Sequence, residues 1–149
     1  MQALKLALAV RIIEEAIAAA RAQGFAPMAV VVVDASGNVV ALQREDGASM
    51  MRADIAFGKA WTSIAMGVPS RALVARVKDN PGFFHALMVT GQGKFIPQTG
   101  GVLIQDADGM TIGAVGASGG TGDQDEQICL SALEVAQGHA PLQVGGADV

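Results

Sequence analysis

Two apolar, β-branched runs that each fold back on themselves constrain this chain more than any other feature of its sequence. The first run, MAVVVVD, leads through the turn ASGN (35–38) into VVALQR (39–44). The second run spans 101–105 and returns over 110–117 through the turn DADG. Val and Ile favour strands, whereas Gly, Asn and Asp favour turns. Because a hairpin joins antiparallel neighbours, the sequence predicts an antiparallel sheet built from two hairpins.

Helical patterns fill the chain around these hairpins. We expect helices over 4–23, 49–66, 71–79 and 122–138, with a short helical turn after Pro81 and a short extra strand near 95–97. Hairpins outnumber βαβ units in this order, so the predicted fold class is α/β in the α+β sense, with helices packed on the sheet. In the first helix, the apolar residues that recur at steps of three and four are Leu6, Val10, Ile13, Ile17 and Ala20.

Size and surface composition favour one domain that associates with copies of itself. A chain of 149 residues favours a single domain over 1–149, and we expect the tail 139–149 to be loosely ordered or to dock on a neighbour. Hydrophobic residues make up 51% of the chain and charged residues only 16%. This surface has little charge for a free monomer, so we expect a homo-oligomer that hides apolar faces.

Charge and composition exclude several classes of partner. The net charge is −4, no run of Lys or Arg exists, and the chain has one Trp and no Tyr, so nucleic acid is not an expected partner. No stretch of 18 uncharged apolar residues exists, so no membrane span is expected. The N-terminal segment lacks a signal-peptide pattern, which makes the cytoplasm the expected location. Cys129 is the single cysteine, which excludes a disulfide framework, and no metal-ligand spacing is present.

The stretch GAVGASGGTGDQDEQICLSAL (113–133) invites comparison with phosphate-binding loops. It contains neither G-x-x-x-x-G-K-[ST] nor G-x-G-x-x-G, so neither standard nucleotide motif is present. Thr121 with Gln124, or Asp123 with Glu126, has the spacing of a capping box at the start of the last helix. The carboxylates of this turn repel phosphate and satisfy the helix dipole, so a capped strand-to-helix turn is the simpler interpretation.

Two charged residues fall on otherwise apolar helix faces. Asp125 shares a stripe with Cys129, and Lys59 lies in the segment IAFGKAW. A buried charge needs a partner, and for Lys59 the candidates are Asp46 and Asp125. The pair is either a structural ion pair or a set of groups for acid–base chemistry or anion binding.

The segment GGVLI…DADGMTIGAVGASGGTGDQDE strongly resembles the GlcG/HbpS-like family of haem-binding or haem-degrading proteins, which includes the C-terminal domain of PduO-type cobalamin adenosyltransferases. The segments MAVVVVDASGNVVALQREDGA and ADIAFGKAWTSIAMG follow the family pattern in the same order, so the resemblance covers about 4–137. The resemblance implies a profilin-like fold with a central antiparallel sheet of about five strands and helices on both faces. It also implies dimer-based oligomers up to the octamer, a matching Lys at position 59, and haem as the candidate cofactor.

One departure from the family concerns histidine. Some members ligate haem through a histidine in the N-terminal part of the domain, whereas the first histidine here is His85 and the other is His139. His85 follows the apolar PGFF segment and is either a packing residue or a ligand. Met50 and Met51 either pack in the core or line a pocket for a flat ligand, and Trp61 is expected in the core or an interface.

Further candidate ligand-binding residues are polar groups and glycines at the ends of strands. Arg44 and Asp46, at the exit of the first hairpin, form either a solvated edge or a site for a carboxylate ligand, since the Arg fork matches a carboxylate. The glycine-rich turns allow close approach of a backbone or a flat ligand. The candidates in these turns are Gly100, Gly101, Ser118, Gly119, Gly120 and Thr121.

These observations leave three functions open. The first is a small-molecule-binding protein for haem or another tetrapyrrole. The second is an enzyme for a small organic acid or aromatic metabolite, with Lys59 and Asp125 as catalytic residues in a pocket between the second helix and the glycine-rich turn. The third is a non-catalytic oligomeric assembly or sensory module. Family resemblance does not choose among them, because one fold hosts many functions.

Overall fold

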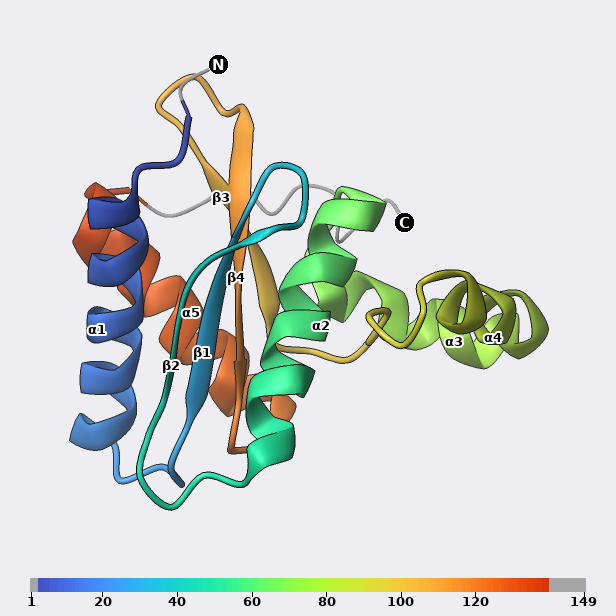
Figure 1. Cartoon of the computed structure of the whole chain (residues 1–149), viewed down its shortest axis with the longest axis horizontal. Coiled ribbons are helices and arrows are strands. Elements are labelled where there is room, and N and C mark those ends of the chain that lie inside the picture. Colours follow the sequence, from blue (N-terminus) through green and yellow to red (C-terminus); the bar gives the residue numbers. More distant parts are fainter. Residues whose placement is uncertain (1–2, 140–149) are drawn as a thin grey trace.

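A computed structural model describes residues 3–139 of the chain, in which helices and hairpins alternate (Figure 1). The last described residue is His139, so most of the predicted loose tail lies outside the described residues. The elements are α1 (Leu6–Ala22), β1 (Ala29–Asp34), β2 (Val39–Arg44), α2 (Met50–Met66), the 3-10 helix η1 (Ser70–Leu73), α3 (Val74–Asp79), α4 (Pro81–Thr90), β3 (Gly101–Gln105), β4 (Thr111–Ser118) and α5 (Gly122–Gln137).

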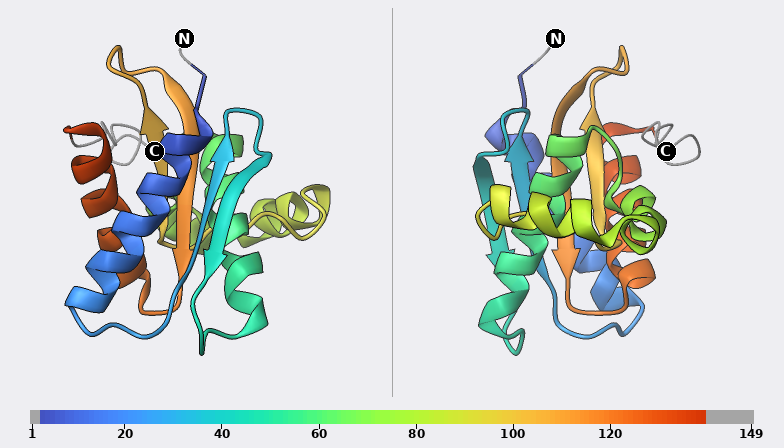
Figure 2. Two further views of the ribbon diagram at one scale, coloured as in Figure 1. Left: turned by 60° about the vertical axis from the view of Figure 1, so that its left-hand side comes forward. Right: turned by 90° about the vertical axis from the view of Figure 1, so that its right-hand side faces the viewer.

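The sheet has the strand order β2-β1-β4-β3, and every neighbouring pair is antiparallel. Helices α1 and α5 pack side by side on one face, and α2 covers the other (Figure 2). The prediction of an antiparallel sheet with helices on both faces is therefore confirmed.

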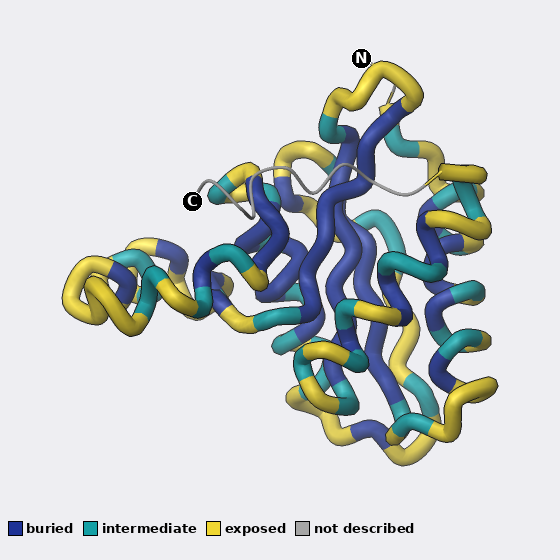
Figure 3. Tube along the Cα trace, turned by 180° about the vertical axis from the view of Figure 1, so that it is seen from behind, coloured by how far each residue is buried: buried dark blue, intermediate teal, exposed yellow. Residues whose placement is uncertain are grey.

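The apolar run in β1 is continuous because the strand is covered on both sides. Val30 and Val32 pack in the core beneath α1 and α5, whereas Val31 and Val33 pack against α2. Successive side chains of a strand point to opposite faces, so a strand between two helical layers needs apolar residues at every position. Figure 3 shows the result as a buried central sheet inside a more exposed shell.

The two hairpin turns use the same chemistry. In the first, Oδ1 of Asp34 accepts hydrogen bonds from the backbone N–H of Ser36 at 2.9 Å and of Asn38 at 3.0 Å. In the second, Oδ1 of Asp106 accepts from the N–H of Asp108 and Met110, both at 3.0 Å. An Asp side chain that bonds its own turn in this way favours the reversal locally, which explains why both hairpins were recognisable from sequence.

Two details of the predicted elements are wrong. The extra strand near 95–97 is absent from the described sheet, which has four strands. Instead, the N–H of Ile96 donates to Oγ1 of Thr62 at 2.7 Å, so this segment pairs with α2. The segment after Pro81 forms the whole of α4 rather than a short turn.

The predicted stripe of α1 is correct in part. Ile13 and Ala20 are buried, but Leu6 is 60% exposed. Ile12 and Ala16 are fully buried with Ile13, so the inward face is rotated from the predicted one. No helix among residues 3–139 combines the length and the hydropathy needed to cross a bilayer.

Helices α3 and α4 form an arm that projects beyond α2, away from the sheet (Figure 1). A small core of its own holds the arm to the end of α2, with Leu73, Phe84 and Phe95 buried together. The outer side of the arm is apolar as well, since Phe83 is 52% and Val89 is 70% exposed.

Candidate functional site

Lys59 and Asp125 form a buried ion pair between helices from opposite faces of the sheet. Nζ of Lys59 lies 2.9 Å from Oδ2 of Asp125 and donates a second hydrogen bond, 3.0 Å long, to the carbonyl oxygen of Ala117. Oδ1 of Asp125 accepts from the N–H of Gly120 at 2.9 Å. The two side chains are 6% and 2% exposed. Of the two predicted partners of Lys59, Asp125 is therefore the correct one and Asp46 is wrong.

The glycines around this pair make room for the protein's own groups. A Cβ at Gly100, where φ is +134°, would lie 2.8 Å from Nζ of Lys59. A Cβ at Gly101 would overlap the carbonyl oxygen of Lys59, and one at Gly119 would overlap that of Pro27. The close backbone approach expected of these glycines is thus present, and α2 and the Pro27 backbone fill the space. Their role toward a ligand stays a prediction.

The strand-to-helix turn is capped as the sequence predicts. Oγ1 of Thr121 accepts from the N–H of Gln124 at 3.2 Å, and Oε1 of Gln124 accepts from the N–H of Thr121 at 3.1 Å. Of the two predicted capping boxes, the one between Thr121 and Gln124 forms. Just before the turn, Oγ of the buried Ser118 accepts from Nη1 of Arg52 at 3.2 Å.

Asp123 and Glu126, near the start of α5, contact Arg71 of η1; the side chain of Asp123 is 81% exposed, whereas that of Glu126 is 14% exposed. Nε of Arg71 lies 2.9 Å from Oε1 of Glu126, and its Nη2 contacts Asp123. The hydrogen bonds to Asp123 and Glu126 raise the pKa of Arg71 above its ordinary value. The sequence signal for this cluster was absent, because Arg71 lies 52 residues from Asp123.

Cys129 lies one turn after Asp125, and its side chain is fully buried. Burial, followed by the negative charge of Asp125, raises the pKa of the Cys129 thiol far above its ordinary value. Only the thiolate is a good nucleophile or metal ligand, so this thiol is inert in the folded protein. The apolar stripe that the sequence predicts for Asp125 and Cys129 is therefore buried at Cys129.

Arg44 and Asp46 lie apart from the buried pair, on the rim of an open groove of about 470 Å³. The groove runs between the C-terminal half of α1 and the exit of the first hairpin. Its volume falls within the range of small-molecule sites, about 300–1,000 Å³. The described residues that line it are Ile17, Arg21, Pro27, Gln43, Arg44, Glu45 and Asp46.

The walls of the groove are fixed by Arg21 and Glu45, which the sequence analysis did not identify. Nε of Arg21 lies 3.0 Å from Oε2 of Glu45, and its Nη2 donates to the carbonyl oxygens of Phe25 and Ala26 at 2.6 and 2.9 Å. Oε1 of Glu45 accepts from the N–H of Met28 at 2.9 Å. These bonds hold the end of α1 to the hairpin. The available signal was the position of Glu45 between Arg44 and Asp46.

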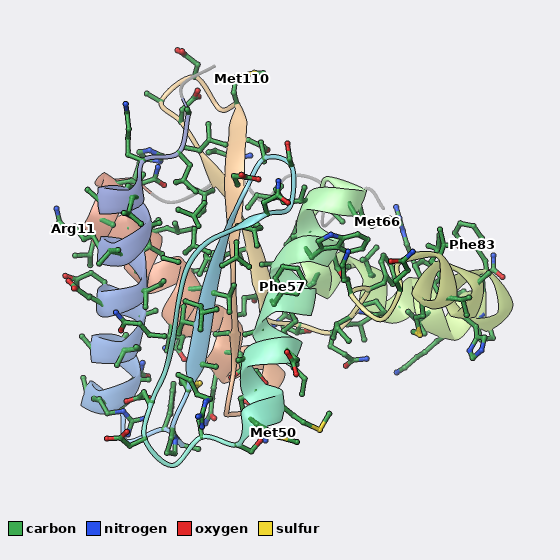
Figure 4. The ribbon with its side chains drawn as sticks, in the orientation of Figure 1. Arg11, Met50, Phe57, Met66, Phe83 and Met110 are labelled. Carbon is green, nitrogen blue, oxygen red and sulfur yellow. The ribbon has the colours of Figure 1, made fainter. Side chains whose placement is uncertain are left out.

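The remaining candidates are placed on other surfaces. His85 is exposed on α4, so its prediction as a packing residue is wrong, and Phe84 takes the buried position there. Met50 and Met51 are 79% and 57% exposed at the start of α2, which makes their prediction as core residues wrong. Figure 4 shows Met50 at this end of the helix. Trp61 is half-buried, and Nζ of Lys94 lies 5.9 Å from the centre of its ring.

Comparisons with known proteins agree with this architecture. Residues 4–134 match the family described as haem degrading protein HbpS-like. A Citrobacter freundii protein described as an uncharacterized 15.0 kDa protein in the dhaT-dhaS intergenic region is 32% identical over 72% of this chain and 75% of its own length. The corrinoid adenosyltransferase PduO of the same organism is 30% identical over 72% of this chain, which spans only 31% of that protein.

A solved structure, described as a PduOC:heme complex, has the same fold. It superimposes with a TM-score of 0.82 at 28% identity, over 95% of this chain and 100% of that one. The relationship to PduO-type proteins that the sequence predicts is thereby confirmed.

Proposed function

This chain belongs to the family described as haem degrading protein HbpS-like, and we propose on that premise that it binds a tetrapyrrole such as haem in the groove between α1 and the end of β2. The observation that carries the choice of surface is the guanidinium of Arg44 on the rim of this groove. The choice of ligand class follows from the similarity to a protein solved in complex with heme.

The groove combines two apolar side chains with a free cation, within a lining that is otherwise polar. Ile17 and Pro27 supply apolar contact, and Arg44 is exposed above them. Nη1 of Arg44 donates to the carbonyl oxygen of Ala48 at 2.6 Å, and within residues 3–139 its Nε and Nη2 bind no other group. A guanidinium with free donors binds a carboxylate in a forked, charge-assisted geometry. A flat apolar macrocycle with carboxylate side chains matches both features.

The lining of the groove offers contacts for the macrocycle but no ligand for its iron. Haem iron is held in proteins by His, Cys, Met or Tyr. None of these residue types is present among the described residues that line the groove. The ion pair of Arg21 with Glu45 and the bonds of both side chains to the backbone hold the walls of the groove, and walls held in this way orient a ligand. The proposal therefore depends on apolar contact and on a carboxylate, and not on a bond to iron.

For Lys59 and Asp125 we propose a structural role in preference to the catalytic one. A catalytic acid or base must come within hydrogen-bond reach of the substrate. Both side chains are almost fully buried, and the oxygens of Asp125 are engaged by Lys59 and Gly120. Buried ion pairs that join elements are common outside active sites. The arrangement supports a structural ion pair that connects α2, α5 and the glycine-rich turn.

We further propose that residues 1–149 form one domain that assembles into a dimer-based homo-oligomer, up to the octamer. The support is apolar exposure at two places, the start of α2 with Met50 and the arm with Phe83 and Val89. Exposed apolar side chains that gather on projecting elements are typical of association surfaces. Light scattering coupled to size exclusion tests the assembly, and a monomer at all concentrations would contradict it.

A haemin titration tests the proposed function. We expect the Soret band to shift and to saturate at a fixed ratio of haemin to chain, and Arg44→Gln to weaken the binding. An unchanged haemin spectrum at stoichiometric protein, together with unquenched Trp61 fluorescence, would contradict tetrapyrrole binding. Trp61 is a clean reporter because the chain has one Trp and no Tyr.

A further inference from the structure

We infer that the groove selects its ligand through carboxylates and not through iron, so that an iron-free tetrapyrrole carboxylate binds as tightly as haem. The inference rests on the proposed function, since it concerns the same groove. It follows from where the structure places the side chains that are able to ligate iron. Among residues 3–139, the histidines, the cysteine and the exposed methionines lie away from the groove or are unable to bond to a metal.

The first group of iron ligands comprises the two histidines and the cysteine. His85 is on the arm, which projects from the other side of the molecule. His139 lines a different cavity, of about 230 Å³, at the end of α5. Cys129 is fully buried, and burial raises the pKa of its thiol, so the thiolate needed for ligation does not form at neutral pH.

The second group comprises the exposed methionines, of which Met50 and Met51 are on α2 and Met110 is in the turn between β3 and β4, away from the groove. Met50 and Met51 open α2, which covers the sheet face opposite to α1. The groove is lined by α1 and by the hairpin exit, and neither thioether is among its lining residues. Figure 4 shows Met50 at the end of α2, on the far side of the sheet from α1. Met28 follows the lining residue Pro27 but is fully buried. Among residues 3–139, no exposed thioether therefore belongs to the lining of the groove.

The charges of the groove also limit how many carboxylates it takes. Arg21 is already paired with Glu45 at 3.0 Å and bonded to the backbone, so Arg44 is the cation left for a ligand. Asp46 lies on the same rim and repels a second carboxylate placed beside it. We therefore expect one carboxylate of the ligand at Arg44, with any other directed to solvent. Recognition of this kind is the same for a macrocycle with iron and for one without it.

Parallel titrations with haemin and protoporphyrin IX, followed by quenching of Trp61, test the inference. We expect the two dissociation constants to agree within about threefold. Arg44→Gln should weaken both by about tenfold, because it removes the charge of the forked contact with the carboxylate. Arg76→Gln, on α3, is the matched control and should change neither. Circular dichroism of both variants checks that they are folded.

The outcomes separate this inference from the proposed function. Haemin that binds at least about tenfold tighter than protoporphyrin IX, or that loses its affinity when Met50 and Met51 are both replaced by Leu, would overturn the inference and leave the proposed function standing. Binding of both macrocycles that is unaffected by Arg44→Gln would overturn the role of the groove. Binding of neither macrocycle would overturn the proposed function itself.

Discussion

The first turn of α5 is fastened on two sides, and the two fastenings differ in exposure. On the inner side, Asp125 bonds to Lys59 at 2.9 Å, with both side chains buried. On the outer side, Asp123 and Glu126 contact Arg71, whose side chain is 51% exposed. Both clusters connect α5 to a segment more than 50 residues earlier in the chain. The inner pair is buried on both sides, whereas in the outer cluster Arg71 and Asp123 are exposed and only Glu126 is largely buried.

Burial determines how much each contact contributes to the free energy of unfolding. An exposed ion pair gains little, because water and salt screen it and its side chains lose freedom when they pair. A buried pair is costly to break, because the partner left behind is an uncompensated charge. The comparison teaches that the inner cluster determines whether α5, the glycine-rich turn and α2 stay together. The outer cluster adjusts that arrangement only slightly.

The largest effect is expected from Asp125→Ala. The change leaves Lys59 charged and buried, and it removes the acceptor of the N–H of Gly120. We expect a loss of about 3–5 kcal/mol in the free energy of unfolding. Urea denaturation followed by Trp61 fluorescence measures it. Asp123→Ala is the matched control on the outer side, and an equal loss in the two variants would show that burial is not the deciding factor.

Gly100→Ala should disturb the ion pair of Lys59 and Asp125 without removing a charge. The new Cβ would lie 2.8 Å from Nζ of Lys59 at a position where φ is +134°. Overpacking and backbone strain together should cost about 2–4 kcal/mol. Gly24→Ala is the control, since its φ is +69° and a Cβ there has no neighbour within 4 Å. If the two variants lose the same amount of stability, strain alone explains the effect and crowding of Lys59 does not.

Cys129 lies one helical turn after Asp125 on the inner face of α5. Its thiol makes the free energy of unfolding of the protein depend on pH. The pKa of its thiol is raised in the folded protein by burial, so the folded state keeps the proton that the unfolded state releases above its ordinary pKa of about 8.5. Its contribution is therefore fully present below that pH and is lost as the pH rises. At about pH 10 the loss should be about 2 kcal/mol.

The pH experiment compares the wild type with Cys129→Ala. The free energy of unfolding is measured by urea denaturation at neutral pH and at about pH 10, and the variant should show a smaller decline than the wild type. Parallel declines in the two proteins would mean that other groups carry the pH dependence. The neutral-pH difference between the proteins separates the cost of the lost sulfur atom from the effect of titration.

Much of this architecture is predictable from sequence because its signals are local. The hairpins carry their own turn chemistry at Asp34 and Asp106, and the capping box at Thr121 spans one helical turn. Asp125 was assigned to the inner face of α5 from the spacing of apolar residues alone. Each of these depends on residues a few positions apart, where periodicity and turn preferences act.

The features that the sequence does not predict depend on contacts between segments that are distant in the chain. The choice between Asp46 and Asp125 as the partner of Lys59 required knowing which strand end α2 crosses. The predicted strand near 95–97 failed because the segment found hydrogen bonds on α2, at Thr62. The groove was recognised only at Arg44 and Asp46, since its other wall comes from α1. The binding role of Arg44 and Asp46 stays a prediction, and for Lys59 and Asp125 a structural role is our proposal in place of the predicted catalytic one.

Removing the capping box at the start of α5 should have an intermediate effect on the free energy of unfolding. Thr121→Ala removes the acceptor of the N–H of Gln124 while the buried pair stays in place. Loss of an N-cap side chain costs about 1 kcal/mol. Thr121→Ser, which keeps the hydroxyl, should behave as the wild type. A loss as large as that of Asp125→Ala would mean that the cap, and not the ion pair, holds the turn.

Arg71→Ala should have the smallest effect, because it breaks only the outer cluster. We expect a loss of at most about 1 kcal/mol in the free energy of unfolding, since the side chain of Arg71 is 51% exposed.

A high salt concentration should weaken the contacts of Arg71 and leave the buried pair of Lys59 and Asp125 unchanged. At about 1 M NaCl the screening length falls to about 3 Å, so the difference between Arg71→Ala and the wild type should shrink toward zero. The cost of Asp125→Ala should persist at the same salt concentration, because ions do not enter the buried pair. Urea denaturation of the three proteins at low and high salt measures both differences. If the cost of Asp125→Ala also vanished in salt, water would have to reach Lys59, and the inner side of α5 would be an open site rather than a fastening.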